Sequence, residues 1–210
     1  MKFWTTLAPM AALLLIVSCG GKKDDDSSSS SAAKDGFDSP KALVDDMLET
    51  QKKGSIEIAD MVKYMAPEGR QEMAIQMVTM AEMKAQWMEG DEKKAAALKS
   101  IKDLRAKFNL PEKFEDADGL MEDKKKMKAA AAKYFKDVDA KAFLVALFEL
   151  DVMKPESEDK DGEKKGPQIK EVKEIKEDGD KATVTTLLDN GKEEKHKLIK
   201  VDGRWYAIMD

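Results

Sequence analysis

The sequence holds very few of the residues from which proteins build disulfides and metal sites. Among its 210 residues there is a single cysteine and a single histidine, and aromatic residues make up only 6%. One cysteine cannot form an intramolecular disulfide, and one histidine disfavours a zinc site or a catalytic triad that depends on histidine. The formal net charge of -5 argues against a dedicated nucleic-acid binder, because such proteins normally carry a basic face. We therefore expect no nucleic-acid partner, no metal and no cofactor.

Long apolar runs are also rare, and the clearest one lies at the start of the chain. Lys2 is the only charged residue in 1–18, and residues 7–17 form a mainly apolar run. This run has the length of the apolar core of a signal peptide and is too short to cross a bilayer comfortably. We predict that residues 1–18 direct export.

The only cysteine lies where this run stops, in the segment Ile16-Val17-Ser18-Cys19-Gly20. The segment resembles the bacterial lipobox, which pairs an aliphatic residue with small residues and an obligatory cysteine. The resemblance implies a diacylglycerol on the Cys19 thiol, cleavage before Cys19 and acylation of its new amine. Several acyl chains hold a soluble domain at a membrane, whereas one chain binds only marginally. The alternatives are an ordinary secretory signal with an incidental cysteine and an uncleaved anchor made of residues 3–19.

Residues 20–38 are predicted to form a flexible tether, because almost none of their side chains can be buried. About 20 residues of this kind span roughly 25 Å. Gly20, rather than Asp, follows Cys19, and this resembles lipoproteins sorted to the outer membrane. The basic-then-acidic run 22–26 resembles the export tag of some surface-exposed lipoproteins, and the alternative is a plain solubilising linker. We expect a lipid-anchored protein of the cell envelope, at the outer membrane rather than the inner one.

Residues 39–153 show a mainly helical pattern. Ser39 is a suitable N-cap and Pro40 a suitable first helical residue. Asp139 is a candidate cap for a last, strongly apolar helix, for which a buried strand is the alternative. The expected helices cover about 40–53, 58–65, 68–88, a stripe from 98 to 108, 122–136 and 140–150.

From residue 168 onward the pattern changes to strands and tight turns. Asp178-Gly179, Asn190-Gly191 and Asp202-Gly203 are three candidates for two-residue hairpin turns. They predict a four-stranded antiparallel meander over 168–177, 180–189, 192–201 and 204–209. The fold class is therefore predicted as α+β, a single domain over 39–210 whose N-terminal helices pack on a C-terminal sheet.

Counting outward from the turns predicts which side chains share a face. The expected partners are Leu188 with Glu193, Ile175 with Ala182, Ile199 with Tyr206 and Lys197 with Ile208. The predicted core face comprises Ile175, Ala182, Val184, Thr186, Leu188, Ile199, Val201, Tyr206 and Ile208. The opposite face comprises Val172, Thr183, Thr185, Leu187, His196, Leu198, Trp205, Ala207 and Met209. Because the opposite face is also apolar, we expect a helix, ligand or partner to cover part of it.

The helical start Ser-Pro-Lys-Ala-Leu-Val and the end Val-Asp-Gly-Arg-Trp-Tyr-Ala-Ile resemble small exported bacterial domains of the nuclear transport factor two-like, cystatin-like cone superfamily. The resemblance covers residues 39–54 and 168–210, whereas the helical stretch 68–136 is longer than the compact family layout. It implies a curved sheet packed on helices. Members include isomerases, dehydratases and non-catalytic binding domains, so the fold alone does not select a function.

Methionines are the most suggestive chemical candidates. Met73, Met77, Met80 and Met83 share helical spacing, with Met61, Met65 and Met88 nearby, and thioethers could ligate Cu(I). The favoured reading is an apolar core or a partner-binding surface, because flexible methionines fill irregular contacts. Two loops, at 116–119 and 159–162, resemble the centre of a calcium-binding loop but lack its first and last acidic ligands, so no calcium site is predicted.

An isomerase-like site would need a carboxylate and a hydroxyl donor inside the apolar cone. Tyr206, Tyr64 and Tyr134 are the candidate donors, but the pattern forces no carboxylate onto the same buried face, and His196 reads as a half-exposed strand residue. We predict no catalytic residue. The expected function is non-catalytic binding of an envelope protein or a small apolar ligand, with a small isomerase- or dehydratase-like enzyme and a copper binder as alternatives.

Overall fold

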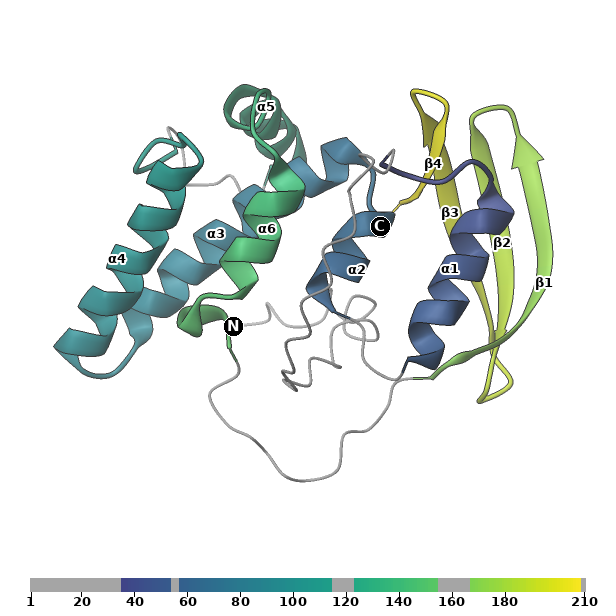
Figure 1. Cartoon of the computed structure of the whole chain (residues 1–210), viewed down its shortest axis with the longest axis horizontal. Coiled ribbons are helices and arrows are strands. Elements are labelled where there is room, and N and C mark those ends of the chain that lie inside the picture. Colours follow the sequence, from purple (N-terminus) through teal and green to yellow (C-terminus); the bar gives the residue numbers. More distant parts are fainter. Residues whose placement is uncertain (1–34, 54–56, 115–122, 155–166, 209–210) are drawn as a thin grey trace, which may run out of the picture. The chain divides into compact units, whose positions relative to one another are not determined.

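The computed structural model describes residues 35–53, 57–114, 123–154 and 167–208, which form six helices and then a four-stranded antiparallel sheet (Figure 1). The predicted α+β class, with the helices before the sheet, is confirmed. Cys19, residues 20–34 of the predicted tether and both calcium-like loops lie outside the described residues. Their assignments stay predictions. Residues 35–38 are described, and the prediction that they belong to a flexible tether is wrong, because Phe37 forms two backbone hydrogen bonds with Trp205.

The chain divides into two compact units. The first, here called the sheet unit, comprises Met1–Ala66 and Asp159–Asp210, and the second, the helical unit, comprises Pro67–Glu158. In sequence, the helical unit is therefore inserted between the helices and the sheet of the sheet unit. The single domain predicted for residues 39–210 stays a prediction.

Helix α1 (Pro40–Lys52) starts the sheet unit at the predicted position. The Ser39 hydroxyl accepts a hydrogen bond from the Ala42 amide at 3.1 Å, and Pro40 occupies the first helical turn, where its missing amide costs nothing. A second, short helix, α2 (Ile58–Tyr64), follows and ends before Pro67, as its sequence predicts.

The sheet comprises β1 (Ile169–Asp178), β2 (Lys181–Leu188), β3 (Glu193–Val201) and β4 (Arg204–Ala207) in the order β1-β2-β3-β4 (Figure 1). All four predicted strands are present within three residues of their predicted ends. Gly179, Gly191 and Gly203 each have positive φ values, which is why the turn-forming dipeptides marked the strand ends so well.

The register between β2 and β3 differs from the prediction by one residue. Leu187, not Leu188, lies opposite Glu193. The Leu188 amide donates to the Lys192 carbonyl at 2.8 Å, so the loop contains the three residues 189–191 instead of two. Because side chains alternate along a strand, this single residue exchanges the two faces of β3 and β4 relative to β2.

The last hairpin keeps its predicted register, and Ile199 lies opposite Tyr206. The Ile208 amide also donates to the Lys197 carbonyl at 2.9 Å, as the predicted pairing requires. Tyr206 nevertheless lies on the face opposite the α1 side, because the register change between β2 and β3 exchanges the faces of β3 and β4 together. Its side chain is still only 4% exposed.

The first hairpin differs from the prediction in two ways. Ile175 pairs with Val184 and not with Ala182, because Gly179 and Asp180 form the loop. The second difference is that β1 has two register shifts of the β-bulge kind, one between Ile169 and Glu171 and one between Val172 and Glu174. The second of these shifts, here called the bulge, brings Val172 onto the same face as Ile175, so the prediction of Val172 on the opposite face is wrong.

The core of the sheet unit lies between α1, α2 and one face of the sheet. Trp205, Leu198 and Ala207, predicted on the opposite face, belong to this core, whereas Tyr206 and Ile199 do not. The buried members of the cluster are Leu43, Val44, Tyr64, Ala182, Val184, Leu198 and Trp205. For the β3 and β4 residues that were predicted on the opposite face, the expected cover is thus provided by helices of the same unit.

The two edges of the sheet differ. The edge formed by β4 is covered, because Phe37 pairs with Trp205 through two backbone hydrogen bonds of 3.1 and 2.7 Å, and Met65 forms a bridge to Ala207. The other edge is formed by β1, and among the described residues no strand pairs with its outer side.

The helical unit contains α3 (Pro67–Trp87), α4 (Asp91–Lys107), α5 (Lys124–Tyr134), α6 (Ala140–Phe148) and a short 3-10 helix, η2 (Asp151–Met153). The Asp139 side chain accepts from the Ala142 amide at 3.0 Å and caps α6, so the apolar run after it is a helix and not a strand.

Aromatic rings and one buried arginine fill the centre of the helical unit. Phe143 makes edge-to-face contacts with Phe108 and Phe135, both at 5.3 Å between ring centroids. Arg105 is only 2% exposed, and its guanidinium forms a 2.8 Å ion pair with Glu82 and lies over the Phe114 ring. A buried charge must be paired, and Glu82 provides the pairing here.

Candidate binding surfaces

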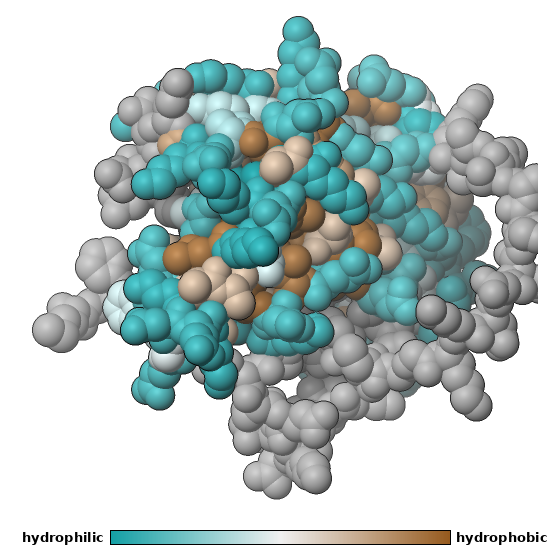
Figure 2. Space-filling model, turned by 60° about the vertical axis from the view of Figure 1, so that its left-hand side comes forward, coloured by the Kyte–Doolittle hydropathy of each residue, from teal (hydrophilic) through white to brown (hydrophobic). Residues whose placement is uncertain are grey.

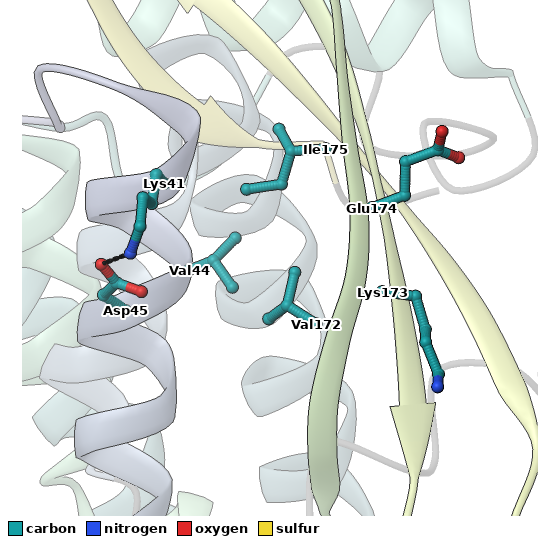
Figure 3. Close-up of a pocket in the computed structure, with 7 residues that line it drawn as sticks. All are labelled: Lys41, Val44, Asp45, Val172, Lys173, Glu174 and Ile175. Atoms are coloured by element: carbon teal, nitrogen blue, oxygen red, sulfur yellow. Dashed lines mark hydrogen bonds and ion pairs between the residues drawn. The ribbon is translucent and has the colours of Figure 1, made fainter.

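A shallow groove of about 350 Å³ lies between α1 and β1 in the sheet unit. Val44 of α1 and Val172 and Ile175 of β1 point toward one another across it (Figure 3). The side chains of Lys173 and Glu174 point away on the other side of the strand (Figure 3). The bulge produces this arrangement, since it places two apolar residues three positions apart on one face.

Charged side chains border the groove. On α1, Lys41 forms an exposed ion pair with Asp45 at 2.6 Å. On β1, Lys173 pairs with Glu171 at 3.1 Å and Lys176 with Glu174 at 3.0 Å. Exposed pairs of this kind contribute little to stability. The groove thus offers a short apolar floor between charged rims and fits an extended chain better than an enclosed small molecule.

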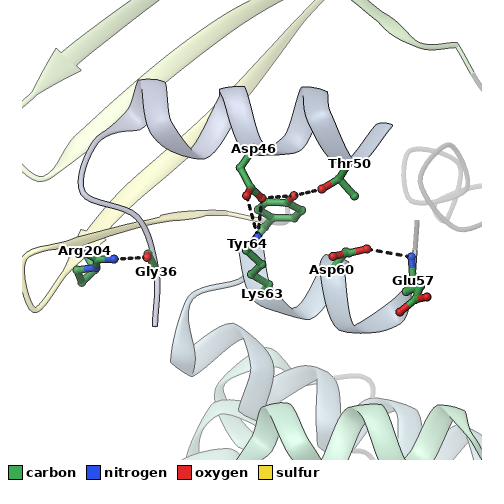
Figure 4. A network of polar contacts seen from close by, with 8 residues as sticks. All are labelled: Gly36, Asp46, Thr50, Glu57, Asp60, Lys63, Tyr64 and Arg204. Atoms are coloured by element: carbon green, nitrogen blue, oxygen red, sulfur yellow. Dashed lines mark hydrogen bonds and ion pairs between the residues drawn. The ribbon is translucent and has the colours of Figure 1, made fainter. Parts of the chain in front are cut away.

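Apart from the groove, a polar network connects α1 and α2 (Figure 4). The Tyr64 hydroxyl donates to the Asp46 carboxylate at 2.6 Å and lies 2.8 Å from the Thr50 hydroxyl. Lys63 also donates to Asp46, at 2.7 and 2.9 Å. This network brings together the two kinds of group, a tyrosine and a carboxylate, that an isomerase-like site would need.

The protonation states of this network disfavour acid-base catalysis. Burial acts to raise the pKa of Asp46, but hydrogen bonds from Lys63 and Tyr64 outweigh it and hold that pKa below its ordinary value. Burial, followed by the hydrogen bond to Asp46, raises the pKa of Tyr64 above its ordinary range. A general base or acid needs a pKa near the working pH, and both groups are shifted away from it. The network therefore has the chemistry of a structural connection.

The other predicted donors are occupied by packing contacts. The Tyr206 hydroxyl donates to the Asp35 carbonyl at 3.2 Å, and its ring lies against Gly36. Tyr134 packs on Phe114 in the helical unit, with 4.8 Å between ring centroids. Tyr64 and Tyr206 belong to the sheet unit and Tyr134 to the helical unit. None of the three lines the groove between α1 and β1.

His196 lies on the core face of β3, not on the predicted opposite face, and is partly buried there. Its Nε2 lies 2.9 Å from the Thr186 hydroxyl, and Thr186 is almost fully buried. Burial lowers the pKa of His196 below its ordinary value. The imidazole is thus held in its neutral form by the core around it.

The methionines divide between core and surface. Met73, Met61 and Met65 are buried, with exposed fractions of 5–7%. Met80 and Met83 on α3 are 45% and 46% exposed. Methionines that bind one copper ion together would lie side by side and be similarly buried. The division between buried and exposed methionines therefore favours packing in the core and contact with a partner over copper binding.

Together with Trp87, the two exposed methionines form what we call the α3 stripe. Trp87 is 86% exposed and follows Met80 and Met83 at the i, i+3, i+7 spacing of one helix face. They are the large hydrophobic side chains that the described part of the chain exposes most. The space-filling view, with the left-hand side of Figure 1 turned forward, shows hydrophobic side chains gathered between hydrophilic ones (Figure 2).

The described segments offer no group of three or more histidine, cysteine, aspartate or glutamate side chains placed to hold a metal ion. None of the helices α1 to α6 is both long and apolar enough to cross a membrane.

Comparisons with models of protein families, with curated proteins and with solved structures find no match to this chain. The resemblance to the cone superfamily therefore stays a prediction, and no function can be transferred from a relative.

Sequence reasoning missed Asp46 as the partner of Tyr64. The available signal was the i, i+4 spacing of Asp46 and Thr50, next to the apolar residues Leu43 and Met47 of the same helix. That spacing places two polar side chains at the border of a buried helix face, where a hydroxyl from another helix can satisfy both.

Proposed function

We propose that this chain is a lipid-anchored cell-envelope protein whose folded part binds another envelope protein through the α3 stripe and performs no catalysis. The anchor is the lipidated Cys19, and the part of the predicted tether before Asp35 allows the folded part to reach partners near the membrane. The observation that carries the binding proposal is the exposure of Met80, Met83 and Trp87 on one helix face. Exposed aromatic and methionine side chains in a contiguous row are typical of protein-binding surfaces.

The chemistry of the sheet unit supports a non-catalytic role. An isomerase-like enzyme needs a deep pocket with a carboxylate of raised pKa beside a tyrosine. The described groove is open and lies apart from Tyr64, and the pKa of Asp46 is lowered. These properties favour binding over catalysis.

The binding proposal is tested by placing a photo-crosslinking amino acid at position 87 in living cells. We expect one distinct crosslinked product, lost when Met80 and Met83 are both replaced by serine. Lys99, which is exposed on α4, is the control position and should give no such product. Equal crosslinking from positions 87 and 99, or none from 87, would contradict a partner on the α3 stripe.

The anchor is tested separately by cell fractionation. Cys19→Ala should move the protein from the detergent-soluble membrane fraction to the soluble fraction. Ser18→Ala, which keeps a small residue beside the cysteine, is the matched control and should stay in the membrane fraction. If Cys19→Ala remained with the membrane, the lipid-anchor proposal would be wrong.

A further inference from the structure

Strand β1 exposes an unusual sequence along the open edge of the sheet. It reads Ile-Lys-Glu-Val-Lys-Glu-Ile-Lys-Glu-Asp, with an apolar residue followed by Lys and Glu three times. Within the described ranges, β2 is the only strand that pairs with β1. A sheet edge of this length leaves backbone donors and acceptors available to another strand.

Two copies of the β1 sequence placed antiparallel to each other have complementary charges. In an antiparallel pair centred between Lys173 and Glu174, each basic residue of one copy lies opposite an acidic residue of the other, and apolar residues meet at Val172 and Ile175. The opposing positions are Lys170 with Glu177, Glu171 with Lys176, Val172 with Ile175 and Lys173 with Glu174. Shifting this pairing by one residue in either direction places like charges opposite each other, which is destabilising.

The bulge makes this register geometrically consistent. A two-fold axis perpendicular to a sheet joins residues that lie on the same face, and in a regular strand residues three apart lie on opposite faces. The register shift between Val172 and Glu174 changes this alternation locally. Val172 and Ile175 both point toward α1, whereas Lys173 and Glu174 both point away from it (Figure 3). The three inner pairs, Glu171 with Lys176, Val172 with Ile175 and Lys173 with Glu174, therefore each join side chains of the same face.

We propose that β1 pairs with β1 of a second copy of this chain, forming a two-fold dimer with a continuous eight-stranded sheet. Such an interface is isologous, because every contact occurs twice across the axis. The apolar floors of the two grooves meet at Val172 and Ile175, and the charged side chains form complementary rows beside them. This surface lies on the sheet unit and is independent of the α3 stripe and of the lipid anchor.

The test uses two charge variants of the full chain. The first replaces Lys170, Lys173 and Lys176 by Glu, and the second replaces Glu171, Glu174 and Glu177 by Lys. Each variant alone places like charges opposite one another in the proposed register. Mixed together, the acidic strand of the first lies opposite the basic strand of the second at all six positions.

The measurement is sedimentation equilibrium of the full chain in density-matched detergent, with micelles in large excess over protein. We expect the wild-type chain to dimerise, each variant alone to dissociate at least about tenfold more readily, and the equimolar mixture to recover the dimer. A control variant with Lys93, Lys99 and Lys113 replaced by Glu has the same change in net charge on exposed residues outside β1 and should dimerise like the wild type. Recovery in the mixture also shows that both variants are folded.

Two results would overturn the proposal. A wild-type chain that stays monomeric up to about 0.1 mM, a weak-interaction concentration, would show that the charges guard the edge against pairing. Dimers that persist in each charge variant alone would show that the copies associate through another surface.

Discussion

At the scale of single residues, Asp46 is the group on which the two helices of the sheet unit converge. It accepts hydrogen bonds from Tyr64 and Lys63 of α2, and the Tyr64 hydroxyl also contacts Thr50 on α1. Tyr64 and Thr50 are buried, whereas Lys63 is about one-third exposed. The buried hydroxyls should therefore contribute more to stability than the more obvious ion pair.

Tyr64→Phe is expected to destabilise the folded chain by about 1–2 kcal/mol, because it leaves the buried Thr50 hydroxyl without this partner. Lys63→Met removes the partly exposed ion pair with Asp46 and should cost less than about 1 kcal/mol. Both values are measured by urea denaturation. A larger loss from Lys63→Met than from Tyr64→Phe would contradict this order.

His196 predicts a pH dependence of stability. Because burial lowers its folded-state pKa, the unfolded chain binds a proton more readily than the folded chain. The stability contributed by neutral His196 is thus fully present above the unfolded pKa of about 6.5 and is lost as pH falls through the folded value. His196→Gln keeps a side-chain polar group near Thr186 but cannot titrate.

The wild type should lose unfolding free energy relative to His196→Gln as the pH falls from about 7.5 to about 5. If the variant is the less stable protein at pH 7.5, the two unfolding free energies should therefore converge at the lower pH. Carboxylates titrate in both proteins, so the difference between the two curves isolates the histidine. A constant difference across this range would show that burial of His196 does not disfavour its protonated form.

At the scale of elements, the sequence predicted which segments are helices and strands but not every register. Caps such as Ser39 and Asp139 and the turn glycines are local signals, and the structure confirms the elements that they bound. The length of the loop between β2 and β3 was predicted wrongly, because Asn190-Gly191 is compatible with both two- and three-residue loops. This single residue exchanged the faces of two strands, so Trp205 lies on the face that packs against α1 and Tyr206 lies on the other, where it is also buried.

The bulge in β1 could not be predicted for a related reason. A bulge is selected by packing against a neighbouring element, here the contact of Val172 and Ile175 with α1. Alternation along β1 alone places these residues on opposite faces. The groove and its floor depend on the bulge, so the candidate surface was also beyond the reach of the sequence pattern.

The segment that covers the β4 edge predicts the effect of a single glycine. Gly36 has a φ of +78°, and a Cβ added there would lie 2.5 Å from the Tyr206 ring. Gly203 has a similar φ of +80° but nothing within 4 Å of an added Cβ. Gly36→Ala should therefore destabilise the chain more than Gly203→Ala, by about 1–3 kcal/mol in thermal or urea unfolding. Equal losses would show that backbone strain alone accounts for both.

At the scale of the whole molecule, the helical unit is an insertion in the sequence of the sheet unit. Its residues, Pro67–Glu158, are contiguous and contain their own buried centre around Phe143 and Arg105. The insertion contains most of the helical stretch that is longer than the layout expected from the sequence resemblance. It also suggests that the two units can be separated.

We expect a fragment of residues 67–158 to fold alone, with a helical circular dichroism spectrum and cooperative unfolding. The same fragment with Phe143→Asp is the control and should lose cooperativity, because Phe143 is fully buried. A wild-type fragment without a cooperative transition would show that residues 39–210 fold as the single predicted domain.

The attachment of the N-terminal segment to β4 decides where mechanical tension enters the protein. Arg204 donates to the Gly36 carbonyl (Figure 4) and pairs with Asp38. The backbone N–H and C=O groups of Phe37 and Trp205 form two hydrogen bonds with each other. If the lipid on Cys19 fixes the chain to a membrane, a pull on the folded part travels through the tether to these contacts first. Because Trp205 belongs to the buried core, the force would pass directly into the sheet and would not be absorbed by unwinding α1.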